Sequence, residues 1–374
     1  MGFAPAMTGP RFTPLADSLP ATVPFIGPET LERDRGRPFR ARLGANESLF
    51  GPSPKAVAAM QAAVREVWKY GDAQNHELRL ALAEAHGVTP DCIMIGEGID
   101  GLLGYLVRLV VGPGDPVVTS EGAYPTFNYH VAGFGGALHK VPYRDDREDP
   151  EALIARAAEL KAKLVYLSNP DNPMGTWLPA GQVQAMIEAV PEGTLMVLDE
   201  AYIEFAPEGT APAIDPEDPR VIRFRTFSKA HGLAGARVGY AIAAAPLITA
   251  FEKVRNHFGM CRISQAGALA SLADTAWLAE VKSQVAEGRA MIARIAEANG
   301  LSALPSGTNF VTVDCGADGA FARRVLAGLA ERDVFVRMPG VAPLDRCIRI
   351  ASGPEDQLTV LAEELPKALA AARG

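Results

Sequence analysis

A short segment of this chain brings together one lysine, two hydroxyl side chains and one arginine. Thr226 and Ser228 precede Lys229 closely, and Arg237 lies eight positions beyond the lysine. A lysine in a partly desolvated turn can lose its proton and form a Schiff base with an aldehyde. The two hydroxyls and the fixed cation suit a phosphate group bound nearby. The types and spacing of these residues therefore predict a site for pyridoxal 5'-phosphate.

Two further polar residues follow short apolar runs of the kind that form strands. Asp199 and Asn172 each come after such a run, and Lys229 comes after the strand-like alternating run 221–225. In an open parallel sheet, ligands collect at the carboxyl ends of the strands. We therefore expect Asp199, Asn172 and Lys229 to meet at one edge of such a sheet.

The elements that would position these residues alternate between strand and helix patterns from residue 92 to about residue 245. This order predicts an α/β fold in which a large lobe holds a mainly parallel sheet with helices on both faces. Strands are expected over 92–95, 116–119, 164–167, 195–198, 221–225 and 238–242, and helices over 102–111, 151–160 and 180–190.

The rest of the chain predicts a smaller lobe of α+β type. The Ala-rich stretch 263–299 has almost no helix breaker and is expected to form one or two long helices that lead into this lobe. Strands are expected over 310–313, 334–337 and 347–351, a helix over 320–331, and a closing helix from residue 355. The Pro-rich arm before residue 40 has little pattern, and we expect it to lie across the surface or across a partner subunit.

Composition is that of an ordinary globular protein, with 374 residues and a net charge of −8. The length allows two lobes, because single cores seldom grow beyond roughly 250 to 300 residues. The acidic balance argues against a nucleic-acid partner or an anionic membrane surface. The four cysteines have no zinc-type spacing, so we expect reduced, buried thiols and no metal. No signal peptide or membrane-spanning run is evident, and we expect a cytoplasmic protein.

The ordered set of motifs resembles the class I/II, fold-type I pyridoxal-phosphate aminotransferases, and among them the histidinol-phosphate aminotransferase-like group. The resemblance covers residues 43–350 and is carried by Leu43-Gly44-Ala45-Asn46-Glu47, Tyr70-Gly71-Asp72, Asn169-Pro170-Asp171-Asn172-Pro173-Met174-Gly175, Asp199-Glu200-Ala201-Tyr202, the Lys229 segment, Asn309-Phe310 and Arg349-Ile350. It implies an N-terminal arm and part of the small domain in residues 1–45, a large cofactor-binding domain in 46–285 and a small C-terminal domain in 286–374.

The resemblance implies a role for each residue around the cofactor ring. Lys229 would form the Schiff base and then act as the general base that moves the substrate Cα proton. Asp199 would keep the pyridine nitrogen protonated, which lets the ring act as an electron sink. Asn172 and Tyr202 would donate to the ring 3'-oxygen, and Tyr124 would stack on the ring. The structural alternatives are a helix N-cap for Asp199 and a core position for Tyr124.

The loop Gly96-Glu97-Gly98-Ile99-Asp100-Gly101 is the expected site of the cofactor phosphate. The backbone amides of Gly98, Ile99 and Asp100 would point at the phosphate from a helix start. The resembled family usually has a hydroxyl residue at position 99 and an acid at position 101. We therefore expect phosphate binding to depend more on the backbone and on three side chains, those of Thr226, Ser228 and Arg237.

The resemblance also implies how substrates and a second subunit take part. Arg349 would bind the anionic end of the substrate, and Arg337 would be the second cation that favours a phosphate-bearing substrate. Asn46 and Asn309 would touch the substrate. Tyr70 would reach across a homodimer to the neighbouring cofactor phosphate, so that the active sites are shared. The implied partners are small molecules, namely histidinol phosphate or a related amino donor and 2-oxoglutarate, a 2-oxo acid acceptor, in a ping-pong reaction.

Several other functions remain open on the sequence alone. The loop 96–101 also matches the G-x-G-x-x-G fingerprint, which would indicate an NAD-dependent dehydrogenase. An aromatic amino acid aminotransferase is the nearest alternative, because the chain departs from the family's usual residues at Ile99, Gly101, Gly122-Ala123, Met174 and His231. A decarboxylase or a carbon–sulfur lyase on the same fold, and a catalytically silent binding protein, are further alternatives.

Overall fold

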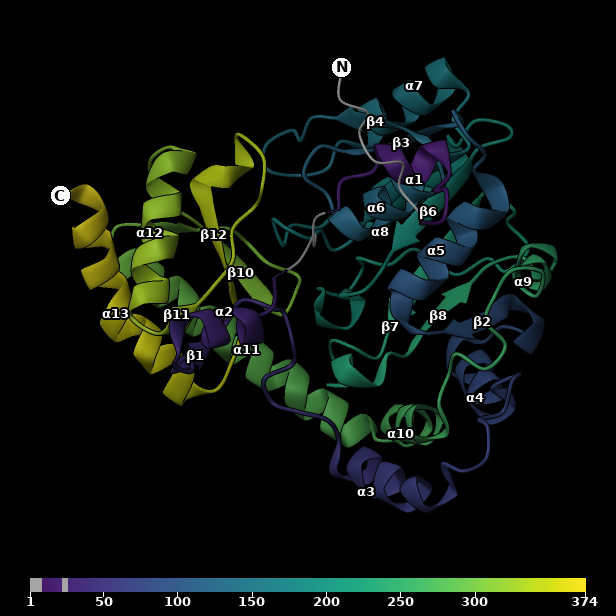
Figure 1. The fold of residues 1–374 in the computed structure, drawn as a ribbon, viewed down its shortest axis with the longest axis horizontal. Helices are drawn as coiled ribbons and strands as arrows, with labels where there is room; N and C mark the ends of the chain where they lie inside the picture. The colour runs from purple at the N-terminus through teal and green to yellow at the C-terminus, as the bar shows by residue number, and fades with distance from the viewer. Residues whose placement is uncertain (1–8, 22–25) are drawn as a thin grey trace.

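Two lobes make up the molecule in the computed structural model, which describes residues 9–21 and 26–374. Figure 1 shows that each lobe is built around its own β-sheet and that the long helix α11 (Thr275–Ala298) runs towards both. The large lobe holds a seven-stranded sheet, and the small lobe holds a three-stranded and a two-stranded sheet. The predicted boundaries after residues 45 and 285 stay predictions. Part of the predicted arm, at 1–8 and 22–25, lies outside the described residues.

The sheet of the large lobe is mainly parallel, as the alternation of strand and helix patterns predicts. Its strands follow the order β2, β8, β7, β6, β5, β3, β4. Every neighbouring pair is parallel except the two pairs that contain β8, which are antiparallel. The strands are β2 (Ile93–Gly96), β3 (Pro116–Ser120), β4 (Ala137–Val141), β5 (Leu164–Ser168), β6 (Leu195–Asp199), β7 (Val221–Thr226) and β8 (Gly239–Ile242).

Helices cover both faces of this sheet because successive side chains of a strand point to opposite faces. Tyr166 of β5 packs on the face that is covered by α5, α6 and α9. Its neighbours Val165 and Leu167 pack on the other face, against α7 and α8. These helices are α5 (Gly98–Val110), α6 (Pro125–Gly133), α7 (Pro150–Leu160), α8 (Ala180–Glu188) and α9 (Ala245–Phe251).

The small lobe has an antiparallel sheet in which β10 pairs with both β9 and β12. Two helices, α12 and α13, share its apolar core. The early strand β1 pairs in parallel with β11, so the start of the chain joins this lobe. The elements are β1 (Ala41–Arg42), β9 (Ser302–Ala303), β10 (Phe310–Asp314), β11 (Val334–Phe335), β12 (Cys347–Ala351), α12 (Gly319–Glu331) and α13 (Glu355–Arg373).

The remaining elements include two helices in the arm, where the sequence predicts little pattern. These helices, α1 and α2, each begin at a proline, whose fixed φ suits the first helical position. The elements are α1 (Pro14–Ser18), α2 (Pro28–Arg35), α3 (Pro54–Ala63), α4 (His76–His86), α10 (Arg262–Leu272) and the 3-10 helices Val64–Glu66, Pro90–Cys92, Ile203–Phe205, Ala234–Ala236 and Leu344–Arg346.

Two expectations need correction. Strand β4 is absent from the expected strands. It lies at the edge of the sheet with mostly half-buried side chains, so its sequence lacks a continuous apolar run. Cys261 is exposed, whereas Cys92, Cys315 and Cys347 are buried, so the expectation of buried thiols fails for Cys261. None of the described helices is long and apolar enough to cross a membrane.

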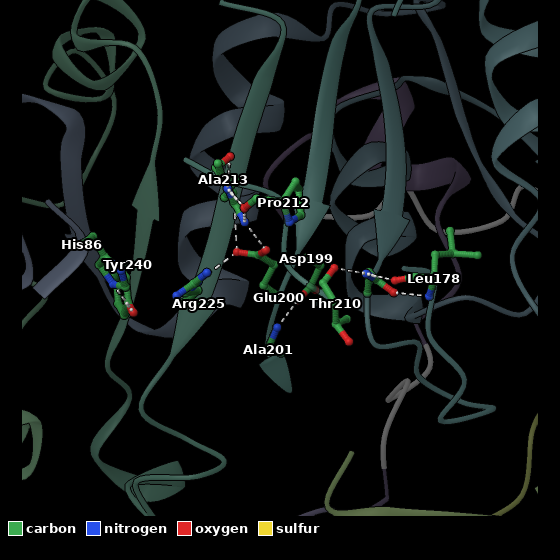
Figure 2. A network of polar contacts seen from close by, with 12 residues as sticks. His86, Leu178, Asp199, Glu200, Ala201, Thr210, Pro212, Ala213, Arg225 and Tyr240 are labelled. Atoms are coloured by element: carbon green, nitrogen blue, oxygen red, sulfur yellow. Dashed lines mark hydrogen bonds and ion pairs between the residues drawn. The ribbon is translucent and has the colours of Figure 1, made fainter. Parts of the chain in front are cut away.

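A buried ionic network fixes the chain directly after β6. The two oxygens of Glu200 accept from Arg223 Nη2 at 2.6 Å and from Arg225 Nε at 2.8 Å. Figure 2 shows this carboxylate beside Arg225 and near the carbonyl groups of Pro212 and Ala213. Burial by itself raises the pKa of Glu200, but the two arginines outweigh it and hold that pKa below its ordinary value. Glu200 is therefore a structural carboxylate, next to Asp199 in the chain.

Replacing Glu200 by Gln is expected to lower the free energy of unfolding by about 3 to 5 kcal/mol near neutral pH, because it leaves two buried guanidinium groups without their countercharge. Urea unfolding measures the change. Because the folded pKa of Glu200 is depressed, its contribution is present above the ordinary value of 4.5 and is lost as the pH falls below it, so the two proteins should converge in acid. Glu159→Gln, at the exposed pair with Arg156, is the control and should change little. A loss below about 1 kcal/mol in Glu200→Gln would contradict this account.

Candidate active site

The start of helix α5 forms one end of the site. Ser228 and Thr226 are linked by a 3.0 Å hydrogen bond between their hydroxyl groups, and Arg237 Nη1 lies 3.4 Å from Ser228 Oγ. Arg237 Nη2 also donates to the carbonyl oxygen of Glu97 at 3.5 Å, directly before the helix begins. Two hydroxyls, a guanidinium and the first amides of a helix thus lie together. That donor set binds phosphate.

Close backbone contacts hold this end of the site together. Gly98 has a φ of 76°, and a Cβ atom there would lie 2.3 Å from Arg237 Nη2. A Cβ atom on Gly239 would lie 2.7 Å from the backbone of Gly98 and Ile99. Ile99 itself points into the apolar core, so it offers the phosphate only its backbone amide. That the backbone and three side chains carry the anion stays a prediction.

Asp100 connects the arginine to the tyrosine expected to stack on the ring. Tyr124 donates its hydroxyl hydrogen to Asp100 Oδ1 at 2.8 Å, and Asp100 Oδ2 lies 3.5 Å from Arg237 Nη2. Burial first, and the Asp100 charge second, raise the pKa of Tyr124 well above its ordinary value. The tyrosine is therefore a neutral ring held in a fixed place beside the anion site.

Asp199 is a buried carboxylate at the carboxyl end of β6. Its Oδ2 accepts from the hydroxyl of Tyr166 at 2.7 Å, and its Oδ1 accepts from the amide of Ala201 at 3.0 Å. Burial raises the pKa of Asp199 to about 6, although both hydrogen bonds act in the opposite direction. Within the described residues no lysine, arginine or histidine forms a salt bridge with it. Such a carboxylate suits a ligand that brings its own positive charge.

Lys229 lies in a chain of hydrogen bonds that converges on Tyr202. Its Nζ donates to the carbonyl oxygen of Asn46 at 3.0 Å and lies 5.4 Å from the centre of the Tyr202 ring. The hydroxyl oxygen of Tyr202 accepts from the side-chain amide of Asn46 at 3.2 Å and from the side-chain amide of Asn172 at 3.4 Å. The lysine, both amides and the tyrosine therefore line one space.

The small lobe contributes the arginines expected at the substrate. Arg349 is half-buried, and its Nη1 donates to Asn172 Oδ1. Arg337 is bridged to Arg349 through the backbone, with Arg337 N donating to Arg349 O at 3.1 Å, and its side chain bonds the carbonyl of Ile26. Asn309 Nδ2 donates to Asn46 O at 3.1 Å. Two cations and the amide of Asn309 thus come from the small lobe, and they lie beside Asn46 and Asn172.

Three buried polar atoms in this cluster are available to a ligand. Among the described residues, Asn46 Oδ1, Asn309 Oδ1 and Arg349 Nε have no hydrogen-bond partner. Buried polar atoms in folded proteins are nearly always paired, and these three belong to one hydrogen-bonded cluster, so they suit a polar ligand. Together with the anion site, the buried carboxylate and the lysine, they fit the phosphate, the ring nitrogen and the aldehyde of pyridoxal 5'-phosphate and an anionic substrate.

One expected site residue lies outside this cluster within a single chain. The side chain of Tyr70 is 76% exposed and stacks on Phe258 with ring centres 4.7 Å apart. Val67 and Trp68 are also exposed nearby in the chain. Within one chain, the side chain of Tyr70 is therefore accessible to another molecule.

Sequence reasoning missed two residues that build this site. Gly239 lies two residues after Arg237, and this spacing is the only feature of the sequence that relates Gly239 to its contact with Gly98. Tyr166 lies within a strand that was expected only to pack, and no local pattern marks its hydrogen bond to Asp199. In the part of the chain that the structure describes, no three histidine, cysteine, aspartate or glutamate residues gather as a metal site would require.

The glycine at the start of α5 gives a direct test of the anion site. Gly98→Ala is expected to weaken the affinity for pyridoxal 5'-phosphate about 10- to 100-fold, because the methyl group would displace the Arg237 guanidinium and strain a left-handed backbone. Fluorescence titration of cofactor-free protein measures the affinity. Gly101→Ala lies three residues on in the same helix, where the nearest atom to an added Cβ is 3.4 Å away, and it should bind normally. Equal affinity in both variants would contradict the assignment.

Comparison with known proteins assigns the chain to a family. The model of the family described as aminotransferase class I and II matches residues 41–365. Histidinol-phosphate aminotransferase 2 of Carboxydothermus hydrogenoformans is 34% identical over 357 residues, which cover 94% of this chain and 98% of that protein. Histidinol-phosphate aminotransferase of an Anaeromyxobacter species is 36% identical over 311 residues, with 82% and 85% covered.

A solved structure gives the same assignment. The crystal structure of histidinol-phosphate aminotransferase from Sinorhizobium meliloti, in complex with pyridoxal 5'-phosphate, is 55% identical to this chain and has a TM-score of 0.95. The match covers 97% of this chain and 99% of that one. The dehydrogenase alternative finds no support in these matches. The chain belongs to the class I and II aminotransferases.

Proposed function

We propose that the protein transfers the amino group of histidinol phosphate to 2-oxoglutarate. The chain is a fold-type I aminotransferase that depends on pyridoxal 5'-phosphate. The observation that carries the proposal is the hydrogen-bonded cluster of Lys229, Asn46 and Tyr202, which stands in one lobe with the buried Asp199 carboxylate and the anion site of Ser228 and Arg237. The relatives described above carry the name histidinol-phosphate aminotransferase, and this supports the same donor here.

The roles of the chain's own residues follow from their positions. When bound, pyridoxal 5'-phosphate supplies an aldehyde that captures an amino group and a ring that accepts the electron pair released at Cα. Lys229 would hold the aldehyde carbon and, once the substrate amine has replaced it, take the Cα proton on its Nζ. Asp199 would keep a proton on the ring nitrogen. Asn172 and Tyr202 would hold the 3'-oxygen, and Tyr124 would lie against the ring.

The arginines favour a phosphate-bearing donor over an aromatic amino acid. A single carboxylate needs one bidentate guanidinium, whereas a phosphate with up to two negative charges gains from a second cation. Arg349 and Arg337 are neighbours across a two-stranded bridge, so both can approach one end of a substrate. Asn309 and Asn46, each with a buried unpaired oxygen among the described residues, would bind the hydrogen-bond donors of that substrate.

The exposed aromatic surface around Tyr70 supports a homodimer with shared active sites. Tyr70, Trp68 and Phe258 all lie exposed, and such apolar surface is commonly covered by a partner. Tyr70 would then complete the phosphate site of the neighbouring subunit. We also propose that the enzyme works in the cytoplasm, where its proposed substrates are small soluble metabolites.

A panel of amino donors tests the proposed substrate. Cofactor-loaded enzyme is mixed with each donor in the absence of an acceptor, and absorbance follows the conversion to the aminated cofactor. Histidinol phosphate should react with a kcat/KM at least about tenfold above that of phenylalanine. Arg337→Gln should lower the value for histidinol phosphate about 10- to 100-fold and leave that for phenylalanine within about threefold. Arg323→Gln, an exposed arginine paired with Asp345, is the matched control.

The same experiment distinguishes the alternatives. A preference for phenylalanine that Arg337→Gln leaves unchanged would support an aromatic aminotransferase and overturn the proposed donor. Product release without an aminated cofactor would indicate a decarboxylase or a lyase on this fold.

A further inference from the structure

A tyrosine with no assigned role lies behind the carboxylate that faces the cofactor ring. Tyr166 is in the middle of β5 and is fully buried. Its hydroxyl donates to Asp199 Oδ2 at 2.7 Å, across the adjacent parallel strand β6. The hydroxyl group therefore reaches one of the two oxygens of a carboxylate that the proposed function places against the ring nitrogen.

The position of Tyr166 is tightly defined by packing. Its ring stacks on Phe127 of α6 with centres 4.6 Å apart and planes inclined by 19°. Its backbone is fixed by the register of β5 against β6, in which Tyr166 pairs with Val197 and Ser168 pairs with Asp199. A hydroxyl held in this way can orient a carboxylate, because neither ring nor backbone has room to move.

Asp199 depends on this hydroxyl for its ionised form. Two other acids, Asp100 and Glu200, add their repulsion to the cost of burial. Only two groups of the described chain donate to the carboxylate, and they are the amide of Ala201 and the hydroxyl of Tyr166. Tyr166 is the one side chain of the pair, and a hydrogen bond to a charged group is stronger than one between neutral groups.

We infer that Tyr166 is a positioning residue that keeps Asp199 ionised and aimed at the ring, so that the proton shared by Asp199 and the ring nitrogen stays on the nitrogen. The inference rests on the proposed roles of Asp199 and Lys229. Without the hydroxyl, the carboxylate becomes more basic, and the shared proton moves from the ring nitrogen towards Asp199. A ring without that proton is a weaker electron sink, so Tyr166 acts on the chemistry through Asp199.

Tyr166→Phe removes the hydroxyl and retains the stacked ring. Cofactor labelled at the ring nitrogen is bound to each variant, and the nitrogen NMR shift reports whether that atom carries the proton. The wild type should show a protonated nitrogen at neutral pH, and Tyr166→Phe should show a shift towards the unprotonated value. Its kcat should fall about 10- to 100-fold, with KM changed less than about threefold. Tyr240→Phe, which also loses a buried hydroxyl, one bonded to His86 at 2.9 Å, should leave shift and kcat unchanged.

A second comparison keeps the test decisive even if Tyr166→Phe is unstable. In an Asp199→Asn background the carboxylate is absent. Adding Tyr166→Phe should therefore leave the nitrogen shift unchanged and change kcat by less than about twofold. An unchanged nitrogen shift in the single variant, or a further loss in the double variant, would overturn the inference. Failure of the proposed function gives a different result: if Asp199 does not face the ring nitrogen, Asp199→Asn alone leaves the nitrogen shift unchanged, and if the donor is not histidinol phosphate, only the donor panel changes.

Discussion

Neighbouring parallel strands end at the same edge of their sheet, and the active site depends on this constraint. In the register of the large lobe, Ser168 of β5 lies opposite Asp199 of β6, and Asp199 lies opposite Phe224 of β7. Asp199 ends β6, and the segments that leave β5 and β7 carry Asn172 and Lys229. Residues far apart in the sequence therefore meet without any long-range signal in the sequence, because the topology places every strand end together.

The other half of the site comes from the small lobe and from Asn46, which follows β1. Asn309 donates to the backbone of Asn46, whose carbonyl also accepts from Lys229, and Arg349 reaches Asn172. Contacts between the lobes therefore run through the residues that surround the space for the substrate. Substrate binding and the packing of the two lobes share the same side chains, so each is expected to affect the other.

Local patterns predicted the parts of this protein that depend on local physics. A continuous apolar run marks the strand that ends at Asp199, because buried parallel strands are often continuously apolar, and an alternating run marks the strand that precedes Lys229. The reversed direction of β8 could not be predicted, since a short apolar run has the same pattern in either direction. The contact of Tyr166 with Asp199 depends on the register of two strands, and that of Gly239 with Gly98 on a close backbone approach. Family resemblance supplied the roles of Arg337 and Arg349, which spacing alone does not give.

The account depends most on one amine being held where an aldehyde can reach it. Borohydride reduction of the cofactor-loaded protein, followed by digestion and peptide mapping by mass spectrometry, tests this directly. We expect a single reduced adduct on Lys229, whose Nζ lies 3.0 Å from the carbonyl oxygen of Asn46. An adduct on another lysine, or no adduct in protein that binds the cofactor, would contradict it.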